Sequence, residues 1–77
     1  MNELDLLYEF ADNLKYYMDK KDFTQSDLAR ESYISRESIN KYLNAQRMPT
    51  LKSIVNICCA LKCEFDDLIP FITSPVK

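Results

Sequence analysis

The sequence predicts an all-α fold. Apolar residues recur at three- and four-residue steps in its longer segments, and this spacing places side chains on one face of a helix. Thr or Ser precedes three of these segments, at the positions where helix N-caps are expected. No strand is predicted before residues 71–77, which have some β character. We therefore expect a chain of five helices followed by a short tail.

Length and composition fit one small globular domain. The chain has 77 residues, 47% hydrophobic and 29% charged, which allows a single apolar core. It has no apolar run long enough for a membrane span, and the opening MNELDLL carries acids where a secretory signal has Lys or Arg. The crowded Cys58, Cys59 and Cys63 favour reduced thiols in a cytoplasmic protein.

Residues 2–21 are expected to form the longest helix. One apolar stripe runs along it, made of Leu4, Leu7, Ala11, Leu14 and Met18 and widened by Phe10 and Tyr17. Leu6 and Tyr16 fall outside this stripe. Ordinary surface exposure would explain both of them, and a contact with another subunit is the alternative.

A second, shorter helix of about two turns follows Thr24. Thr24 and Asp27 have the spacing of a capping box, in which each side chain accepts a hydrogen bond from the other residue's backbone N–H. Leu28 and Ala29 are the positions expected to face inward. A tight corner at residues 32–34 then ends this helix.

Residues 36–43 form the third predicted helix. Ser35 is its expected N-cap, and Ile39 and Leu43 are expected to face inward. Asn44 is expected to end it, because Asn tolerates the left-handed conformation better than most residues. Two such short helices cannot bury their apolar sides alone, so the other helices must support them.

Two further helices complete the predicted domain. Thr50 caps a helix at 51–61, whose inner face is expected to comprise Leu51, Ile54, Val55, Cys58 and Leu61. A last short helix covers 65–69 and ends at Pro70. We expect residues 1–69 to form one domain, with the two-helix unit at 24–43, and residues 70–77 to form a tail.

The chain contains no glycine. Tight corners usually depend on Gly because it adopts positive φ without steric cost. Here the corners must be made by Tyr33, Asn44, Ala45 and their neighbours. A non-Gly residue in the left-handed region costs about 1–2 kcal/mol, and less for Asn. We expect Asn44 to adopt this conformation, unless the loop is reshaped.

Residues 23–69 resemble the helix-turn-helix family of phage repressors and Cro-type regulators. The resemblance extends over about two-thirds of the chain and rests on matching residue types at matching spacing. These are Phe23-Thr24-Gln25, Leu28-Ala29, Ile34-Ser35-Arg36, Ile39, Arg47, Pro49, the apolar run 51–61 and Phe65-Asp66-Asp67-Leu68. It implies a five-helix, lambda-repressor-like fold whose helix 36–43 enters the major groove of DNA.

The resemblance also implies which residues contact DNA. Base edges would be contacted from the exposed side of helix 36–43 by Arg36, Glu37, Asn40 and Lys41. Phosphates and sugars would be contacted by Thr24, Gln25, Ser35, Asn44, Arg47 and Lys52. Without this resemblance, a charged outer helix face would be interpreted as an ordinary solvated surface.

The chain departs from the family pattern at an ion pair. Several relatives have an Arg in the first helix and a Glu near the end of the recognition helix, and the matching residues here are Met18 and Leu43. Loss of both charges together avoids an unpaired buried charge, which costs about 3–5 kcal/mol. We expect a Met18–Leu43 contact instead, and a greater dependence of DNA affinity on Arg47 and Lys52.

Charge is unevenly distributed along the chain. The net charge is −2, whereas nucleic-acid-binding domains are usually basic. Residues 1–22 carry six acids and three lysines, but residues 24–56 carry three acids and five bases, a local excess of two positive charges. The predicted DNA-binding segment is therefore positive within an acidic protein, and local field decides where a phosphate binds.

Other activities find little support. The absence of His removes the commonest general base, so no enzyme is predicted, and no cofactor, small-molecule ligand or metal site is expected. The prediction is a small sequence-specific transcriptional regulator that binds a two-fold DNA operator as a homodimer. The alternative is a protein-interaction module, such as an antitoxin or anti-repressor, that keeps the fold with weak or no DNA binding.

Two surfaces are candidates for the dimer contact. Residues 65–76 are preferred because they are apolar and too short to form a core, with Phe65, Leu68, Ile69, Phe71, Ile72 and Val76. The first helix is the second choice, through Leu6 and Tyr16.

Overall fold

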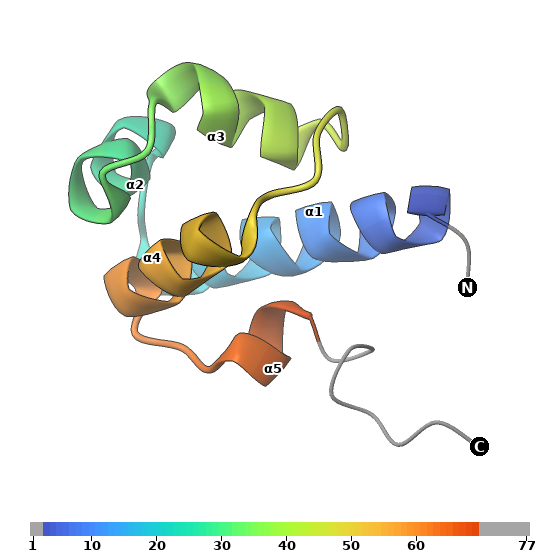
Figure 1. Cartoon of the computed structure of the whole chain (residues 1–77). Coiled ribbons are helices and arrows are strands. Elements are labelled where there is room, and N and C mark those ends of the chain that lie inside the picture. The colour runs from blue at the N-terminus through green and yellow to red at the C-terminus, as the bar shows by residue number, and fades with distance from the viewer. Residues whose placement is uncertain (1–2, 70–77) are drawn as a thin grey trace.

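The computed structural model describes residues 3–69, and these form five helices without a strand (Figure 1). The helices are α1 (Glu3–Lys21), α2 (Gln25–Ser32), α3 (Arg36–Leu43), α4 (Leu51–Leu61) and α5 (Phe65–Leu68). The all-α class and the number of helices are therefore confirmed. The predicted β character of residues 71–77 lies outside the described residues. No helix in the described part is long and apolar enough to cross a membrane.

The helices pack around the long α1. In Figure 1, α2 and α3 lie above α1, α5 lies below it, and α4 packs in front of it. Contacts join α2 to both α3 and α4, and join α1 to α3, α4 and α5. Helix α4 therefore lies between the α2–α3 pair and α5, so it supports both.

Short polar side chains set the starting points of three helices, as predicted. Thr24 Oγ1 accepts a hydrogen bond from Asp27 N at 3.1 Å, and Asp27 Oδ2 accepts one from Thr24 N at 3.0 Å. These two bonds confirm the capping box of α2. Ser35 caps α3 and Thr50 caps α4, and each accepts a 3.1 Å hydrogen bond from the backbone three residues on.

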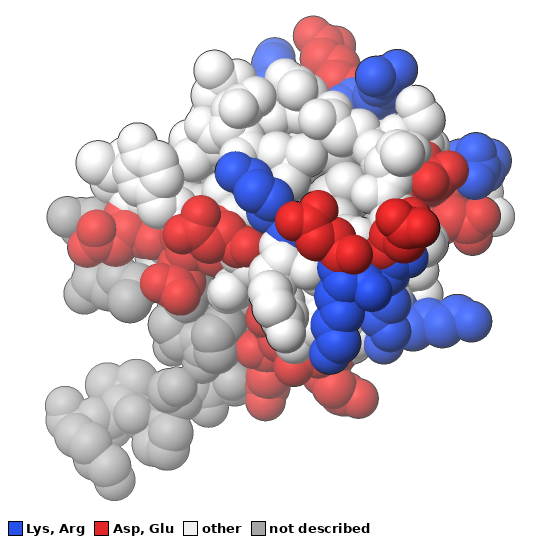
Figure 2. All heavy atoms as spheres, turned by 180° about the vertical axis from the view of Figure 1, so that it is seen from behind, with Lys and Arg blue, Asp and Glu red and all other residues white. Residues whose placement is uncertain are grey.

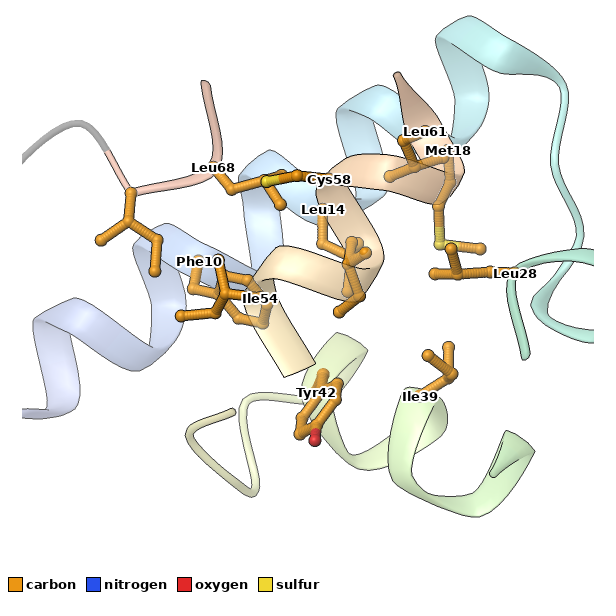
Figure 3. Packing of buried hydrophobic residues seen from close by; sticks show 12 residues of the cluster. Phe10, Leu14, Met18, Leu28, Ile39, Tyr42, Ile54, Cys58, Leu61 and Leu68 are labelled. Atoms are coloured by element: carbon orange, nitrogen blue, oxygen red, sulfur yellow. The ribbon is translucent and has the colours of Figure 1, made fainter. Parts of the chain in front are cut away.

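The core lies where α1, α2, α3 and α4 meet (Figure 3). Its buried members come from all five helices and the residue after α5: Phe10, Leu14, Met18, Leu28, Ile39, Tyr42, Ile54, Ile57, Cys58, Leu61, Leu68 and Ile69. The rings of Phe10 and Tyr42 meet edge to face with centroids 6.0 Å apart. Tyr42 was not predicted as a core residue, yet it links α3 directly to α1.

Three predicted core positions are wrong. Leu4, in the first turn of α1, is 56% exposed, and in α4 Leu51 is 68% and Val55 47% exposed. Ile57 is fully buried instead. Helix α4 is apolar on nearly every side, so the sequence allowed two choices of inner face. Ile54, Ile57, Cys58 and Leu61 follow the helical spacing and face α1 and α2.

The corners are made without glycine by residues in the left-handed region. Tyr33 has φ 60° and Ala45 has φ 56°, and Asp22 and Lys62 also have positive φ. Asn44 has φ −94°, so the first of the two expected alternatives, a left-handed Asn44, is wrong. The side chain of Asn44 instead donates to Asn40 O at 3.0 Å while its backbone extends the helical turn, which shifts the reversal to Ala45.

The three cysteines are free thiols with different exposure. Cys58 is buried, and this burial raises its pKa to about 12, so it remains a protonated core side chain. Cys63 is half-buried, and Cys59 is exposed. Among the described residues, no group of three His, Cys, Asp or Glu side chains is placed to hold a metal ion.

Replacing Ala45 with Gly is expected to stabilise the protein. The left-handed conformation costs Ala about 1–2 kcal/mol, which Gly avoids. Gly also makes the unfolded chain more flexible, and this lowers the free energy of unfolding by about 0.4–1 kcal/mol. The net gain in free energy of unfolding should be about 0.5–1 kcal/mol, measured by urea denaturation. Ala60→Gly within α4 is the control and should instead destabilise the protein. A loss of stability in Ala45→Gly would show that this corner is not strained.

Candidate nucleic-acid interface

Helix α3 has a buried side and an exposed side. Ile39 is fully buried and Tyr42 nearly so, both facing the core. Glu37 and Asn40 are exposed on the opposite side, and Arg36, three residues before Ile39, is exposed at the edge between the two sides. Leu43, predicted to face inward, is half-buried and packs against the edge of the core. The core therefore fixes which side of α3 faces solvent.

The exposed side of α3 presents one free guanidinium and one ion pair. Arg36 makes no hydrogen bond or ion pair within the described part of the chain, so its five donors are available to a ligand. Glu37 Oε2 lies 3.9 Å from Lys41 Nζ. Such an exposed pair has little effect on stability, about 0.3–0.5 kcal/mol. It does place Glu37 beside Lys41.

A chain of amide side chains links the start of α2 to the end of α3. Asn40 Nδ2 donates to Gln25 Oε1 at 3.4 Å, and Asn44 Nδ2 donates to Asn40 Oδ1 at 3.1 Å. Gln25 and Asn44 were predicted to contact the DNA backbone and Asn40 to contact a base. The structure brings all three together at one edge of α3, so Asn40 also orients its two neighbours.

A second polar group lies on the other side of α3. Ser35 Oγ donates to Ser38 Oγ at 3.0 Å, and Arg47 NH1 donates to the same Ser38 oxygen at 3.1 Å. The hydrogen bond from Arg47 connects the loop after α3 to the first turn of that helix. Ser38 was missed by the sequence analysis, because a Ser in a first helical turn gives no specific signal. Lys52 is exposed in the first turn of α4.

A surface cavity of about 340 Å³ lies beside α3 at the junction with α1 and α2. Met18 and Leu43, the residues at the family's ion-pair positions, both line it together with Phe23. Its polar lining comprises Lys15, Asp19, Gln25, Asn40 and Asn44. Lys15 and Asp19 were not predicted as site residues, since nothing in the helical pattern of α1 distinguishes them from other exposed charges.

Comparison with known proteins gives a family and several similar structures. The family model described as helix-turn-helix matches residues 14–68. This chain belongs to the helix-turn-helix family. The crystal structure of the restriction-modification controller protein C.AhdI from Aeromonas hydrophila has a TM-score of 0.78 at 27% identity, over 80% of this chain and 94% of that one.

Two other solved structures are similar to this helix-turn-helix chain. The wild-type restriction-modification controller protein C.Esp1396I has a TM-score of 0.76 at 28% identity, over 99% of this chain and all of the other. A hypothetical transcription factor, NHTF from Neisseria, has a TM-score of 0.80 at 23% identity, which supports the fold alone. No curated protein matches the sequence.

Helix-turn-helix proteins of this kind are DNA-binding regulators of transcription rather than enzymes, which confirms the predicted class of DNA-binding regulator and the prediction that the protein is not an enzyme. In this chain, the helix-turn-helix unit consists of α2, the corner at Tyr33 and α3. Tyr33 is 91% exposed at that corner, so its ring contributes nothing to the core.

The charge distribution separates this unit from the rest of the protein. Seen from behind, acidic side chains form a band across the middle of the molecule with Lys or Arg directly above and below it, and further Lys and Arg flank an acidic group at the top, where α3 lies (Figure 2). This agrees with the local excess of bases in residues 24–56. By this charge count, the segment 24–56, which contains α3, is more favourable for a phosphate than residues 1–22.

The capping box of α2 should make stability depend on pH. Hydrogen bonds from the backbone and side chain of Thr24, with a further one from Arg30, hold the pKa of Asp27 below its ordinary value of 3.8. A carboxyl whose pKa is lower in the folded state than in the unfolded state stabilises the protein at pH values above the unfolded-state pKa. This contribution should be lost as pH falls from about 5 through the folded-state pKa.

Asp27→Asn should remove this part of the pH dependence. The measurement is the free energy of unfolding from pH 7 down to about 2, because the titration of a paired carboxylate is complete there. Asp66→Asn, at an exposed acid with no capping bond, is the control. Equal slopes for wild type and Asp27→Asn below pH 5 would contradict the assignment.

Proposed function

We propose that this protein is a sequence-specific regulator of transcription that inserts α3 into the major groove of its operator. The observation that supports this most is the setting of α3: Ile39 and Tyr42 hold the helix in the core, and the exposed Arg36 side chain in its first turn makes no hydrogen bond or ion pair within residues 3–69. B-DNA's major groove is about 12 Å wide and admits one α-helix. A guanidinium at the start of such a helix can bond bidentately to guanine O6 and N7.

The remaining base contacts follow from the same orientation. Glu37 can accept from a cytosine amino group, and Lys41 can donate to guanine or to a phosphate. Asn40 suits adenine, but its bonds to Gln25 and Asn44 must rearrange for it to read a base. Arg36 is therefore proposed as the main source of specificity.

Backbone contacts are proposed on both sides of α3. Residues at the start of α2 and the end of α3 hold one strand through Thr24, Gln25 and Asn44. Residues on the opposite side hold the other strand through Ser35, Arg47 and Lys52. These contacts set register and orientation, and the sequence is read by the base contacts.

The similar structures narrow the kind of regulator. Two of them are restriction-modification controller proteins that match almost their whole length. We propose that this chain is likewise one small domain, with its DNA-binding unit at 24–43, which acts in the cytoplasm by occupying an operator that overlaps a promoter. Residues 70–77 form the proposed tail.

We propose that two chains bind a two-fold operator, because one recognition helix reads only a few base pairs. The preferred dimer segment needs revision at two of its six apolar residues, because Leu68 and Ile69 are fully buried within one chain. Phe71, Ile72 and Val76 lie outside the described residues. The exposed apolar side of α4 adds Leu51 and Val55 to the proposed surface.

DNA binding should be strongly salt-dependent, and Arg36→Ala should weaken it. The probe is a duplex selected from a random-sequence pool by the wild-type protein. Wild-type affinity should fall steeply as salt rises, because each phosphate contact releases counterions. Losing the guanine contact should cost about 1–3 kcal/mol and relax preference at one base position, measured by fluorescence anisotropy and repeated selection.

Arg30→Ala is the matched control. Arg30 is exposed in α2 and already paired with Asp27 at 3.1 Å, so its removal should leave base preference unchanged. Equal losses in both variants would contradict the role of Arg36. Absence of wild-type binding even at low salt would favour the protein-interaction alternative, which the net charge of −2 also favours.

Val55→Glu should weaken the proposed dimer. A charge in the centre of an apolar contact must be desolvated, which costs several kcal/mol when it is left unpaired. Sedimentation velocity should show a shift from dimer to monomer in Val55→Glu. Ser26→Glu adds the same charge at an exposed position of α2 and should remain dimeric. Dimers of undiminished stability in Val55→Glu would exclude this side of α4.

A further inference from the structure

In the proposed docking, the cavity beside α3 lies where one strand of the operator backbone passes. An α-helix with side chains is about 10–12 Å across, nearly the width of the major groove, so phosphates of both strands lie against its flanks. Ser38, bonded to Arg47, lies on one flank of α3. Leu43 is about 140° away around the helix at 3.6 residues per turn, on the flank that borders the cavity.

The cavity combines an apolar floor with polar walls. Met18, Phe23 and Leu43 form the apolar part, and two amide side chains proposed to contact DNA, Gln25 and Asn44, stand at its edge. Neutral amides can donate hydrogen bonds to a phosphate but cannot neutralise its charge. Gln25 and Asn44 therefore need a nearby cation to neutralise the phosphate. The first-helix Arg of several relatives cannot supply it here, because the matching residue is Met18.

Lys15 is the cation that lines this cavity. It stands three residues before Met18, and residues three apart share a face of a helix. Its side chain is exposed and has no ion pair within residues 3–69. A lysine ammonium on a flexible four-carbon stem can follow a phosphate without a fixed geometry.

We propose that this cavity receives one phosphate of the operator backbone and that Lys15 neutralises it, in place of the arginine lost at Met18. The inference rests on the proposed function. Asp19, one turn further along α1, lines the same cavity and repels the phosphate. The negative charge of Asp19 therefore weakens the contact between Lys15 and the phosphate, and removal of that charge strengthens it.

The test measures the salt dependence of binding to the selected duplex for three variants. Lys15→Ala should bind roughly threefold more weakly at low salt, and its slope of log affinity against log salt should fall by about 0.9, the value for one lost phosphate contact. Asp19→Asn should bind more tightly than wild type. Lys21→Ala is the control: it removes the same charge from an exposed position of α1 that does not line the cavity.

A second measurement locates the contact. Single neutral methylphosphonates are placed along each strand of the duplex, and the one that faces the cavity should weaken wild-type binding but have little further effect on Lys15→Ala. Additive effects at every position, or equal slopes for Lys15→Ala and Lys21→Ala, would overturn the inference while leaving DNA binding intact. Failure of the wild type to bind the duplex would instead overturn the proposed function as well.

Discussion

The burial of the inner sides of α2 and α3 is the constraint on which the rest of the structure depends. Each helix has eight residues, too few to be stable in water alone. Leu28 and Ile39 are both fully buried in the core shared with α1 and α4. Close packing at this point prevents rotation of α3, because any rotation would expose Ile39. The direction of the solvent-facing side chains is thus decided in the core.

The same packing maintains the glycine-free corners. After three of the left-handed residues, the next backbone N–H bonds to a carbonyl five residues earlier: Phe23 to Met18, Gln46 to Lys41 and Cys63 to Cys58, at 2.8–3.1 Å. This is the hydrogen bond of a Schellman helix end, where Gly is the usual left-handed residue. The helices on both sides hold these corners closed, so residues with side chains can replace Gly there.

Elements governed by local chemistry were predictable from the sequence. The capping residues Thr24, Ser35 and Thr50 set helix starts through bonds within one turn, so their types and spacing sufficed. The inner face of α4 was not predictable in the same way, because Leu51 and Ile57 are equally apolar and only the neighbouring helices distinguish them. Asn44 failed similarly, since its side chain had a partner in Asn40 that the sequence did not reveal.

The residues of the candidate site also fall into those that the local sequence predicts and those that depend on tertiary contacts. Residues on the outer side of α3 follow from the helical repeat once Ile39 is known to face inward. Lys15 and Ser38 depend on which surfaces meet in three dimensions, Lys15 at the cavity and Ser38 beneath Arg47. No regular spacing in the sequence marks these two residues. Lys15 lies beside residues of α2 and α3, which are distant in the sequence, and Ser38 contacts the loop after α3, whose path the sequence does not predict.

The pairing of Glu37 with Lys41 has a consequence for discrimination between DNA sequences. In the proposed docking, a carboxylate within the groove is repelled by the phosphates and by acceptor atoms on base edges, whatever the sequence. Only a base with an outward donor, such as cytosine N4, compensates for it. Glu37 would then act mainly by lowering affinity for the vast excess of non-operator DNA. The ratio of operator affinity to non-operator affinity rises in this way, even though neither Glu37 nor Lys41 makes a strong contact.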